Sequence, residues 1–288
     1  MVTFVGEHQS ATLNEIRDRL ISAGGLAISA THLSRLLADR CHLMLKRLHI
    51  EHGRYNSAKT IQAQPAWVHQ FQVEMGSFDN AIFFDKAGFN LHSSRSVGCA
   101  PTGQWAQQTG RPADCKPNIL LLVAIGKDGL YATDMVTGGW NSVSFVAFLN
   151  DGLFPDIAGQ HRTLVMDNAR FHHTGEVQEA VEQAGHRLCF LPPYLPLFNI
   201  SERVFSKIKP VVSCKELCDH HNGLTNVIDS MLSTITANDC TGWLRETARW
   251  MIIAEHGHPL GPEHNASAAL ARHGLSDGLQ VYFSSIFA

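Results

Sequence analysis

Five short apolar runs between residues 80 and 191 constrain the fold of this chain more than any other feature. The runs have the length and the β-branched and aromatic content of buried strands, and turn residues separate them. Segments in which apolar residues recur at helical spacing follow the third run and alternate with the later ones. This order predicts an α/β fold with a mixed sheet and helices on its faces. The predicted strands are 81–85, 118–126, 130–136, 162–167 and 186–191.

Helical spacing marks the rest of this part of the chain. Pro210 is expected to end one of the helices, because proline has no N–H and its ring clashes with the preceding turn. The tail from Pro259 is polar and then weakly apolar, and we predict no element in it. The predicted helices are 141–149, 175–184, 202–209, 223–236 and 239–256.

Residues 1–57 have the pattern of two short helices joined by a glycine turn. Thr12 with Glu15 three residues later is a capping-box signature, and Ser29 is a good N-cap for the second helix. Helix, glycine turn and helix indicate a helix-turn-helix, although a helical hairpin that only packs fits the pattern equally well. The apolar side chains expected to face inward in the second helix are Leu33, Leu36 and Leu37.

Charge distribution favours nucleic acid as a partner of this N-terminal region. The first 60 residues contain eight Lys and Arg against five acids, a net charge of +3 in a chain whose net charge is −3. Outward residues of the second helix would then contact bases and the following cations would contact phosphates, although they could equally form a solvated face. The residues expected to contact DNA are Thr31, His32, Arg35, Lys46, Arg47 and Arg54.

Three acidic residues lie at the ends of predicted elements in the α/β region. Asp85 and Asp167 each end a predicted strand, and Glu202 lies on the first turn of a later helix, with 34 residues between Asp167 and Glu202. Either Asp alone reads as an ordinary cap of a turn. Together with Glu202 they would repel one another unless hard cations such as Mg²⁺ or Mn²⁺ neutralised them. Two such ions about 4 Å apart activate an attacking oxygen and stabilise a leaving one in phosphodiester chemistry.

The strings around these acids also carry a family resemblance. FFDKAGF, MDNARFHH and LPPYLPLFNISE resemble the three catalytic blocks of DDE transposases, closest to the Tc/mariner superfamily and its bacterial insertion-sequence relatives. The segment 95–101 resembles a further motif of that family, and the likeness covers roughly residues 12–255. It implies a ribonuclease-H-like domain that cuts DNA at transposon ends and joins it elsewhere. Asp85, Asp167 and Glu202 would be the catalytic triad and hold two Mg²⁺ or Mn²⁺ ions.

The resemblance carries further expectations. Asn168 and His172 would orient substrate or ligands, Tyr194 would shape the turn before the Glu202 helix, and Asn199 would lie at or near its N-cap. The partners implied are double-stranded DNA, both terminal repeats and target, and a second copy of the chain. The expected domains are 1–57 as a truncated helix-turn-helix region, 58–78 as a linker and connecting helix, 79–256 as the catalytic domain and 257–288 as a tail.

Departures from the family pattern support an alternative, a catalytically inactive or domesticated DNA-binding remnant. Lys86 replaces the acid that follows the first Asp in the family, and the turn before Glu202 is altered. Residues 1–11 are expected to be too short for the helix that usually precedes the helix-turn-helix. No signal peptide or membrane span is predicted, and seven unpatterned Cys indicate a reducing compartment. We expect the nucleus in a eukaryotic host, and the cytoplasm or nucleoid in a bacterial one.

Overall fold

The computed structural model describes residues 2–7, 11–25, 27–43, 56–89, 119–193, 195–212, 221–261 and 265–279. It divides the chain into two compact units, Met1–His52 and Gly53–Ala288, which are described separately here. None of the described helices has the length and apolar composition of a membrane-spanning segment. Four predicted contact or site residues and one predicted motif lie outside the described residues: Lys46, Arg47, Arg54, Tyr194 and 95–101.

The first unit contains the two predicted helices, α2 (Leu13–Ser22) and α3 (Ala30–Cys41). Both predicted caps are present: Thr12 and Glu15 form the capping box, and the Ser29 hydroxyl accepts from the third backbone N–H of α3. A six-residue helix, α1 (Val2–Glu7), precedes them, so the expectation that the N-terminal residues were too short for such a helix is wrong.

A small apolar cluster holds these helices together. Ile16, Leu33 and Leu37 are its buried residues, and Phe4 of α1 packs against them. Leu36 was predicted to face inward with them, but it is 37% exposed, because it lies one position off the stripe that Leu33 and Leu37 share. The side chains of the predicted reading positions are all exposed: Thr31, His32 and Arg35.

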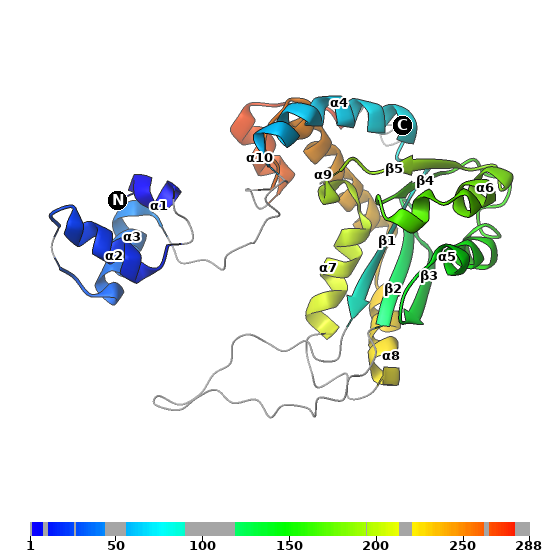
Figure 1. Ribbon diagram of the computed structural model, residues 1–288, viewed down its shortest axis with the longest axis horizontal. Helices are drawn as coiled ribbons and strands as arrows, with labels where there is room; N and C mark the ends of the chain where they lie inside the picture. The colour runs from blue at the N-terminus through cyan, green and yellow to red at the C-terminus, as the bar shows by residue number, and fades with distance from the viewer. Residues whose placement is uncertain are drawn as a thin grey trace. The chain divides into compact units, whose positions relative to one another are not determined.

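The second unit is built on a five-stranded sheet in the order β3-β2-β1-β4-β5 (Figure 1). Three strands form an antiparallel meander, β1 (Ala81–Phe89), β2 (Ile119–Gly126) and β3 (Gly129–Thr137). On the other side of β1, β4 (Thr163–Met166) and β5 (Arg187–Phe190) pair in parallel. The mixed sheet predicted from the order of apolar runs is therefore confirmed.

Helices cover both faces of this sheet, which explains why β2 is apolar at every position. Its alternate residues point into two cores: Leu121 and Val123 into one, Leu122 and Ala124 into the other. The first core is closed by α4 (Ala58–Met75), α7 (Ser201–Val212), α8 (His221–Leu232), α9 (Ala237–Glu255) and α10 (Ala266–His273). The second is closed by α5 (Ser142–Ala147), the π-helix η1 (Phe148–Leu153) and α6 (Gly175–Gln183).

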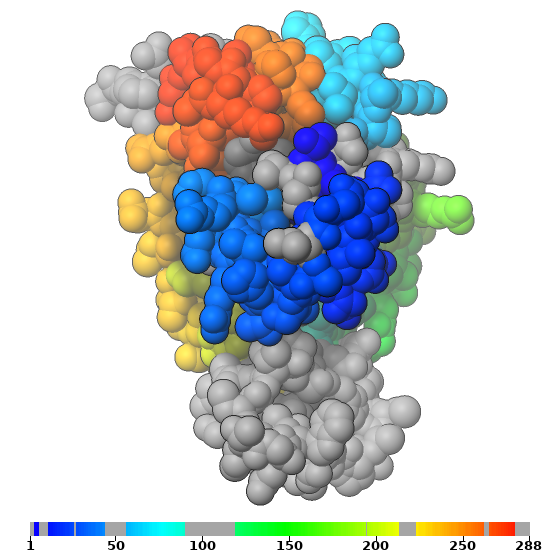
Figure 2. Space-filling model, turned by 90° about the vertical axis from the view of Figure 1, so that its left-hand side faces the viewer, coloured from blue at the N-terminus to red at the C-terminus, as the bar shows by residue number. Residues whose placement is uncertain are grey.

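Helix α4 is an integral part of this second unit. Its residues Val68, Phe71 and Met75 lie in the first core, and the helix contacts α9 and β5. Asn56, just before α4, exchanges two hydrogen bonds with the backbone of Leu260, at 2.7 and 2.9 Å. Figure 2 shows α4, the C-terminal part of α9 and α10 as neighbouring cyan, orange and red surfaces.

Three elements differ from the sequence-based expectation. β1 does not stop at Asp85 but continues to Phe89, because β2 pairs with it over that whole length. Helix α7 passes through Pro210 and ends at Val212, since a proline in the last turn removes only one helical hydrogen bond. The tail, in which no element was predicted, contains α10, capped by Asn265.

Candidate active site

The register of the parallel strands places Asp85 and Asp167 beside each other. Phe83 of β1 pairs with Val165 of β4, so two residues further along Asp85 stands level with Asp167. Asp85 shares the face of Phe83, on the side of the first core. Asp167 follows the last residue of β4, and its carboxylate contacts His172, which packs on Phe145 of the second core. β4 ends at Met166 while β1 continues, so the two acids lie where the parallel part of the sheet opens. The site thus lies at the carboxyl edge of the parallel strands, as predicted, although Asp85 itself is within its strand.

Asn199 connects Asp85 to the helix that carries Glu202. The Asn199 side chain is buried, and its Nδ2 donates to the Phe84 carbonyl at 2.9 Å and to Asp85 Oδ2 at 3.3 Å. Its Oδ1 accepts from the Ser201 N–H at 3.1 Å, which satisfies a free donor at the start of α7. Asn199 therefore lies next to the N-cap position, and it fixes the first turn of α7, with Glu202, against β1.

We predict that Asn199→Ala destabilises the protein and disorders the site. Removing a buried side chain that makes three hydrogen bonds leaves those groups unsatisfied and should cost about 1–3 kcal/mol in the free energy of unfolding. Denaturant titration measures this loss. Asn150→Ala, at an exposed position of η1, is the matched control and should change stability by less than about 0.5 kcal/mol. Equal stability of the two variants would show that the hydrogen bonds of Asn199 do not stabilise the contact between β1 and α7.

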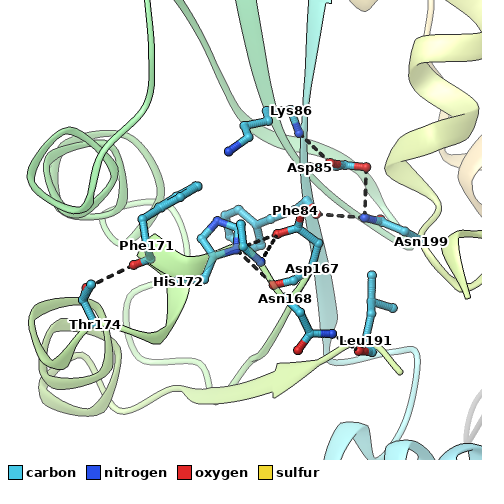
Figure 3. A network of polar contacts seen from close by, with 11 residues as sticks. Phe84, Asp85, Lys86, Asp167, Asn168, Phe171, His172, Thr174, Leu191 and Asn199 are labelled. Atoms are coloured by element: carbon cyan, nitrogen blue, oxygen red, sulfur yellow. Dashed lines mark hydrogen bonds and ion pairs between the residues drawn. The ribbon is translucent and has the colours of Figure 1, made fainter. Parts of the chain in front are cut away.

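His172 holds Asp167 from the other side (Figure 3). It follows β4 in the short 3-10 helix η2 (Arg170–His173) and is only 3% exposed. His172 Nδ1 lies 2.9 Å from Asp167 Oδ1 and 3.2 Å from the Asp167 carbonyl oxygen. The Nε2 atom is buried and has no hydrogen-bond partner among the described residues. Nδ1 is thus the donor, and the contact fixes the orientation of the Asp167 carboxylate.

Asn168 also links two segments beside the site. Its Nδ2 donates to the Leu191 carbonyl oxygen at 2.6 Å, which links the end of β4 to the segment after β5. Beside it, a pocket of about 440 Å³ opens next to Asp167 and is lined by the prolines of the following turn. Asn168 therefore stabilises the segment that lines the pocket. It is exposed and is itself one of the residues that line the pocket.

The two aspartates have opposite electrostatic environments. Burial, followed by the nearby charges of Glu202 and Asp167, raises the pKa of Asp85 to about 7. Burial also acts to raise the pKa of Asp167, but the hydrogen bond and charge of His172 and the Ala169 N–H outweigh it, so that pKa is lowered. The site therefore favours the ionised form of Asp167 and the protonated form of Asp85. Because the charges of both Glu202 and Asp167 raise the pKa of Asp85, the three acids lie close enough to interact electrostatically.

Lys86 points to the opposite face of β1 from Asp85, because successive strand residues alternate. Its Nζ lies 4.1 Å from the centroid of the Phe171 ring. In Figure 3 the Lys86 side chain extends towards Phe171, and the Asp85 carboxylate towards Asn199. This departure from the family pattern therefore puts no ammonium group between Asp85 and Glu202.

The donor chemistry of the site suits Mg²⁺ or Mn²⁺. Carboxylate oxygens are the ligands that these ions prefer, and a cation would relieve the repulsion that raises the pKa of Asp85. Among the described residues, however, no three acidic, His or Cys side chains are gathered closely enough to hold one ion together. Mg²⁺ commonly binds through one or two carboxylates, water and substrate phosphates, so such a cage is not a requirement for this ion.

Comparison with known proteins was made at the level of families, curated proteins and solved structures. Residues 80–220 match the family described as DDE superfamily endonuclease. This part of the chain is a DDE superfamily endonuclease domain. It includes Asp85, Asp167 and Glu202, and the resemblance to DDE transposases inferred from the motifs is confirmed. No curated protein matches the sequence at a significant level.

Solved structures of Mos1 transposase share the fold of this chain. A pre-cleavage Mos1 transpososome aligns with a TM-score of 0.71 at 12% identity, covering 91% of this chain and 78% of that one. A Mos1 mariner paired end complex with Mn gives 0.68 at 13% identity, with 91% and 78% covered. A mariner Mos1 paired end complex with Mg gives 0.63 at 15% identity, with 94% and 77% covered. The predicted ribonuclease-H-like fold is confirmed.

Sequence reasoning missed two residues that shape the site of the DDE domain. Ser201 Oγ donates to the Phe83 carbonyl at 3.3 Å and adds a second link between α7 and β1. Phe171 packs on His172, with ring centroids 4.0 Å apart, and also carries the Lys86 ammonium. Both residues lie inside the quoted motif strings, but nothing in their spacing indicates which neighbour they contact.

Proposed function

We propose that this chain is a transposase-type, metal-dependent DNA endonuclease and strand-transfer enzyme in which Asp85, Asp167 and Glu202 form the catalytic triad. The observation that carries the proposal is that Glu202 and Asp167 both lie near enough to Asp85 for their charges to act on it. The parallel pairing of β1 and β4 supports it by bringing the strand ends next to Asp85 and Asp167 together, and Asn199 ties Asp85 to the start of α7. The endonuclease family match over residues 80–220 supports the same chemistry.

Each acid has a distinct role in this proposal. Asp167, ionised and oriented by His172, would hold the first divalent cation, and Asp85 would share it. Glu202 would complete a second site from the start of α7. When bound, the two ions would activate the attacking oxygen and stabilise the leaving oxygen of a phosphodiester. The His172 contact and the Asn199 tether would keep the two aspartate carboxylates in place during both the cutting and the joining steps.

The proposed substrate is double-stranded DNA, both the terminal repeats of a transposon and the target. Several of the similar structures are Mos1 paired end complexes, one with Mn and one with Mg, and by analogy we propose Mg²⁺ or Mn²⁺ as cofactor and a homodimer on DNA. Tyr194 is proposed to shape the turn before α7. Lys46, Arg47 and Arg54 are proposed to contact phosphates, and the exposed reading positions of α3 are proposed to contact bases.

Incubation of the purified chain with a supercoiled plasmid tests the proposal. We expect nicked and linear products in Mn²⁺ or Mg²⁺ and intact plasmid in EDTA. Equal cleavage in EDTA would point to a contaminating or metal-independent nuclease. A plasmid that carries the inverted repeats flanking the encoding gene should be cut at the repeat ends, whereas a plasmid without them should show only non-specific nicks.

A DNA-binding remnant without activity is the second candidate, and the departures from the family pattern at Lys86 and in the turn before Glu202 motivate it. It predicts salt-sensitive DNA binding and no cleavage with any metal. Both candidates predict that Arg35→Glu, at an exposed position of α3, weakens DNA binding at least about tenfold at low salt, since it replaces a phosphate or base contact by a repulsive charge. Fluorescence anisotropy with Asp39→Asn as a control on the same helix measures this loss.

A further inference from the structure

The geometry points to Lys86 as a phosphate-binding residue of the active site. We propose that its ammonium group contacts a non-bridging phosphate oxygen of the DNA strand that lies across the Asp85–Asp167 edge. The inference rests on the proposed function, because it takes DNA as the ligand. The inference assigns a binding role to Lys86, which stands where the family pattern has an acid after the first aspartate.

The position of the Lys86 ammonium is fixed by a chain of ring contacts. Its Nζ lies 4.1 Å from the Phe171 ring centroid. That ring is held edge-on by Phe145, 5.6 Å away, and by His172, 4.0 Å away. His172 in turn binds Asp167 at 2.9 Å. The ammonium is therefore held at a defined place beside the aspartates rather than free on a flexible stem.

Lys86 makes no direct ion pair in the described part of the chain, although its charge acts to lower the pKa of both Asp85 and Asp167. No carboxylate within the described part of the chain lies within ion-pair distance of its Nζ, and no hydrogen bond to Nζ is formed there. An aromatic face attracts a cation but accepts at most one of its three N–H groups. The remaining N–H groups of this half-buried side chain are available to an anion. Phosphate is the anion that the proposed substrate brings to this edge.

The two faces of β1 would then contact the DNA through different groups. Asp85, Glu202 and the cations they are proposed to hold lie on the α7 side. Lys86 lies on the α5 side with Phe171. A strand that crosses the open end of the sheet would be bound by cations on one side and by an ammonium group on the other.

Salt-dependent DNA binding by the full chain tests the proposal. The affinity for a fluorescein-labelled duplex is measured over a series of KCl concentrations in Ca²⁺, for the wild type and for Lys86→Met, Lys86→Gln and Lys86→Arg. Loss of one phosphate contact should reduce the slope of log affinity against log salt by about one in the Met and Gln variants, and the Arg variant should keep the wild-type slope. Lys207→Met is the control, because Lys207 is already paired with Asp239 at 3.1 Å and its loss should leave the slope unchanged.

An unchanged slope in both Lys86→Met and Lys86→Gln would overturn the proposal, and Lys86 would then only adjust the charge of the site. Mn²⁺ affinity without DNA, measured on the same proteins, shows whether such an adjustment occurs. Plasmid cleavage by the wild type in Mn²⁺ is recorded in parallel. Absence of cleavage would contradict the proposed endonuclease, while the slope would still decide whether Lys86 contacts DNA phosphate.

Discussion

Asp85→Asn is expected to make the protein more stable at neutral and alkaline pH while it abolishes metal-dependent cleavage. Asp85 has a pKa of about 7 in the folded protein because burial and two nearby acids disfavour its ionised form. The folded chain therefore binds a proton that the unfolded chain has lost. Asparagine has nearly the same shape, and the Asn199 Nδ2 can still donate to its carbonyl oxygen.

The sign of the pH dependence follows from the raised pKa. The contribution of protonated Asp85 to stability is complete below the ordinary carboxyl pKa and is lost as the pH rises through about 7. The gain from Asp85→Asn should thus be small near pH 4 and largest above pH 7, at most about 4 kcal/mol for a shift from 3.8 to about 7. Urea unfolding at a series of pH values measures the difference.

Asp229→Asn is the matched control for this prediction. Asp229 lies on the exposed side of α8, so its replacement should change stability little at any pH. A wild type that is as stable as Asp85→Asn across the whole pH range would show that Asp85 is not held in a charge-disfavouring environment. A gain in stability together with a loss of cleavage is the signature of a carboxylate that is retained for function.

Asp167→Asn should reduce metal-dependent cleavage by about three orders of magnitude. A ligand to the metal stabilises the transition state by several kcal/mol, and each 1.4 kcal/mol corresponds to about a factor of ten in rate. The asparagine oxygen can still accept from Ala169 and from His172, so the fold around β4 should be kept. Thermal unfolding close to that of the wild type would confirm that the loss concerns chemistry.

Asp151→Asn, at an exposed position of η1, is the control and should cleave at the wild-type rate. Substantial cleavage by Asp167→Asn would exclude this residue as a metal ligand and would leave the triad incomplete. His172→Gln separates orientation from ligation: it removes the contact to Asp167 Oδ1 but keeps the carboxylate. It should therefore weaken Mn²⁺ binding less than Asp167→Asn does.

Most of the fold could be predicted because periodicity and turn chemistry agree along the chain. The apolar run of β2 and the helix caps at Thr12 and Ser29 are local signals, and the structure contains a strand and helices where they indicate. The end of β1 could not be predicted, since the pairing with β2 that extends it past Asp85 is a long-range contact. The same is true of Leu36, whose exposure depends on what α1 and α2 cover.

In the candidate site, too, local features could be predicted from the sequence and long-range contacts could not. The types of residue and their order along the chain pointed to Asp85, Asp167 and Glu202, because acids at strand ends and helix starts are visible in a sequence. Contacts across the fold were not visible. Asn199 was expected to cap α7, yet its bonds to Phe84 and Asp85 join two elements that lie 114 or more residues apart. The direction of Lys86 depended on strand alternation together with the position of Phe171.

Titration of Mn²⁺ into the purified chain, followed by electron paramagnetic resonance, tests the central claim that these three acids form one metal-binding site. The wild type should bind Mn²⁺ at about pH 8 and more weakly at about pH 6, because Asp85 with its raised pKa then competes for a proton. The variant with Asp85→Asn, Asp167→Asn and Glu202→Gln should not bind it. Mn²⁺ binding of equal strength by the wild type and this triple variant would contradict the claim.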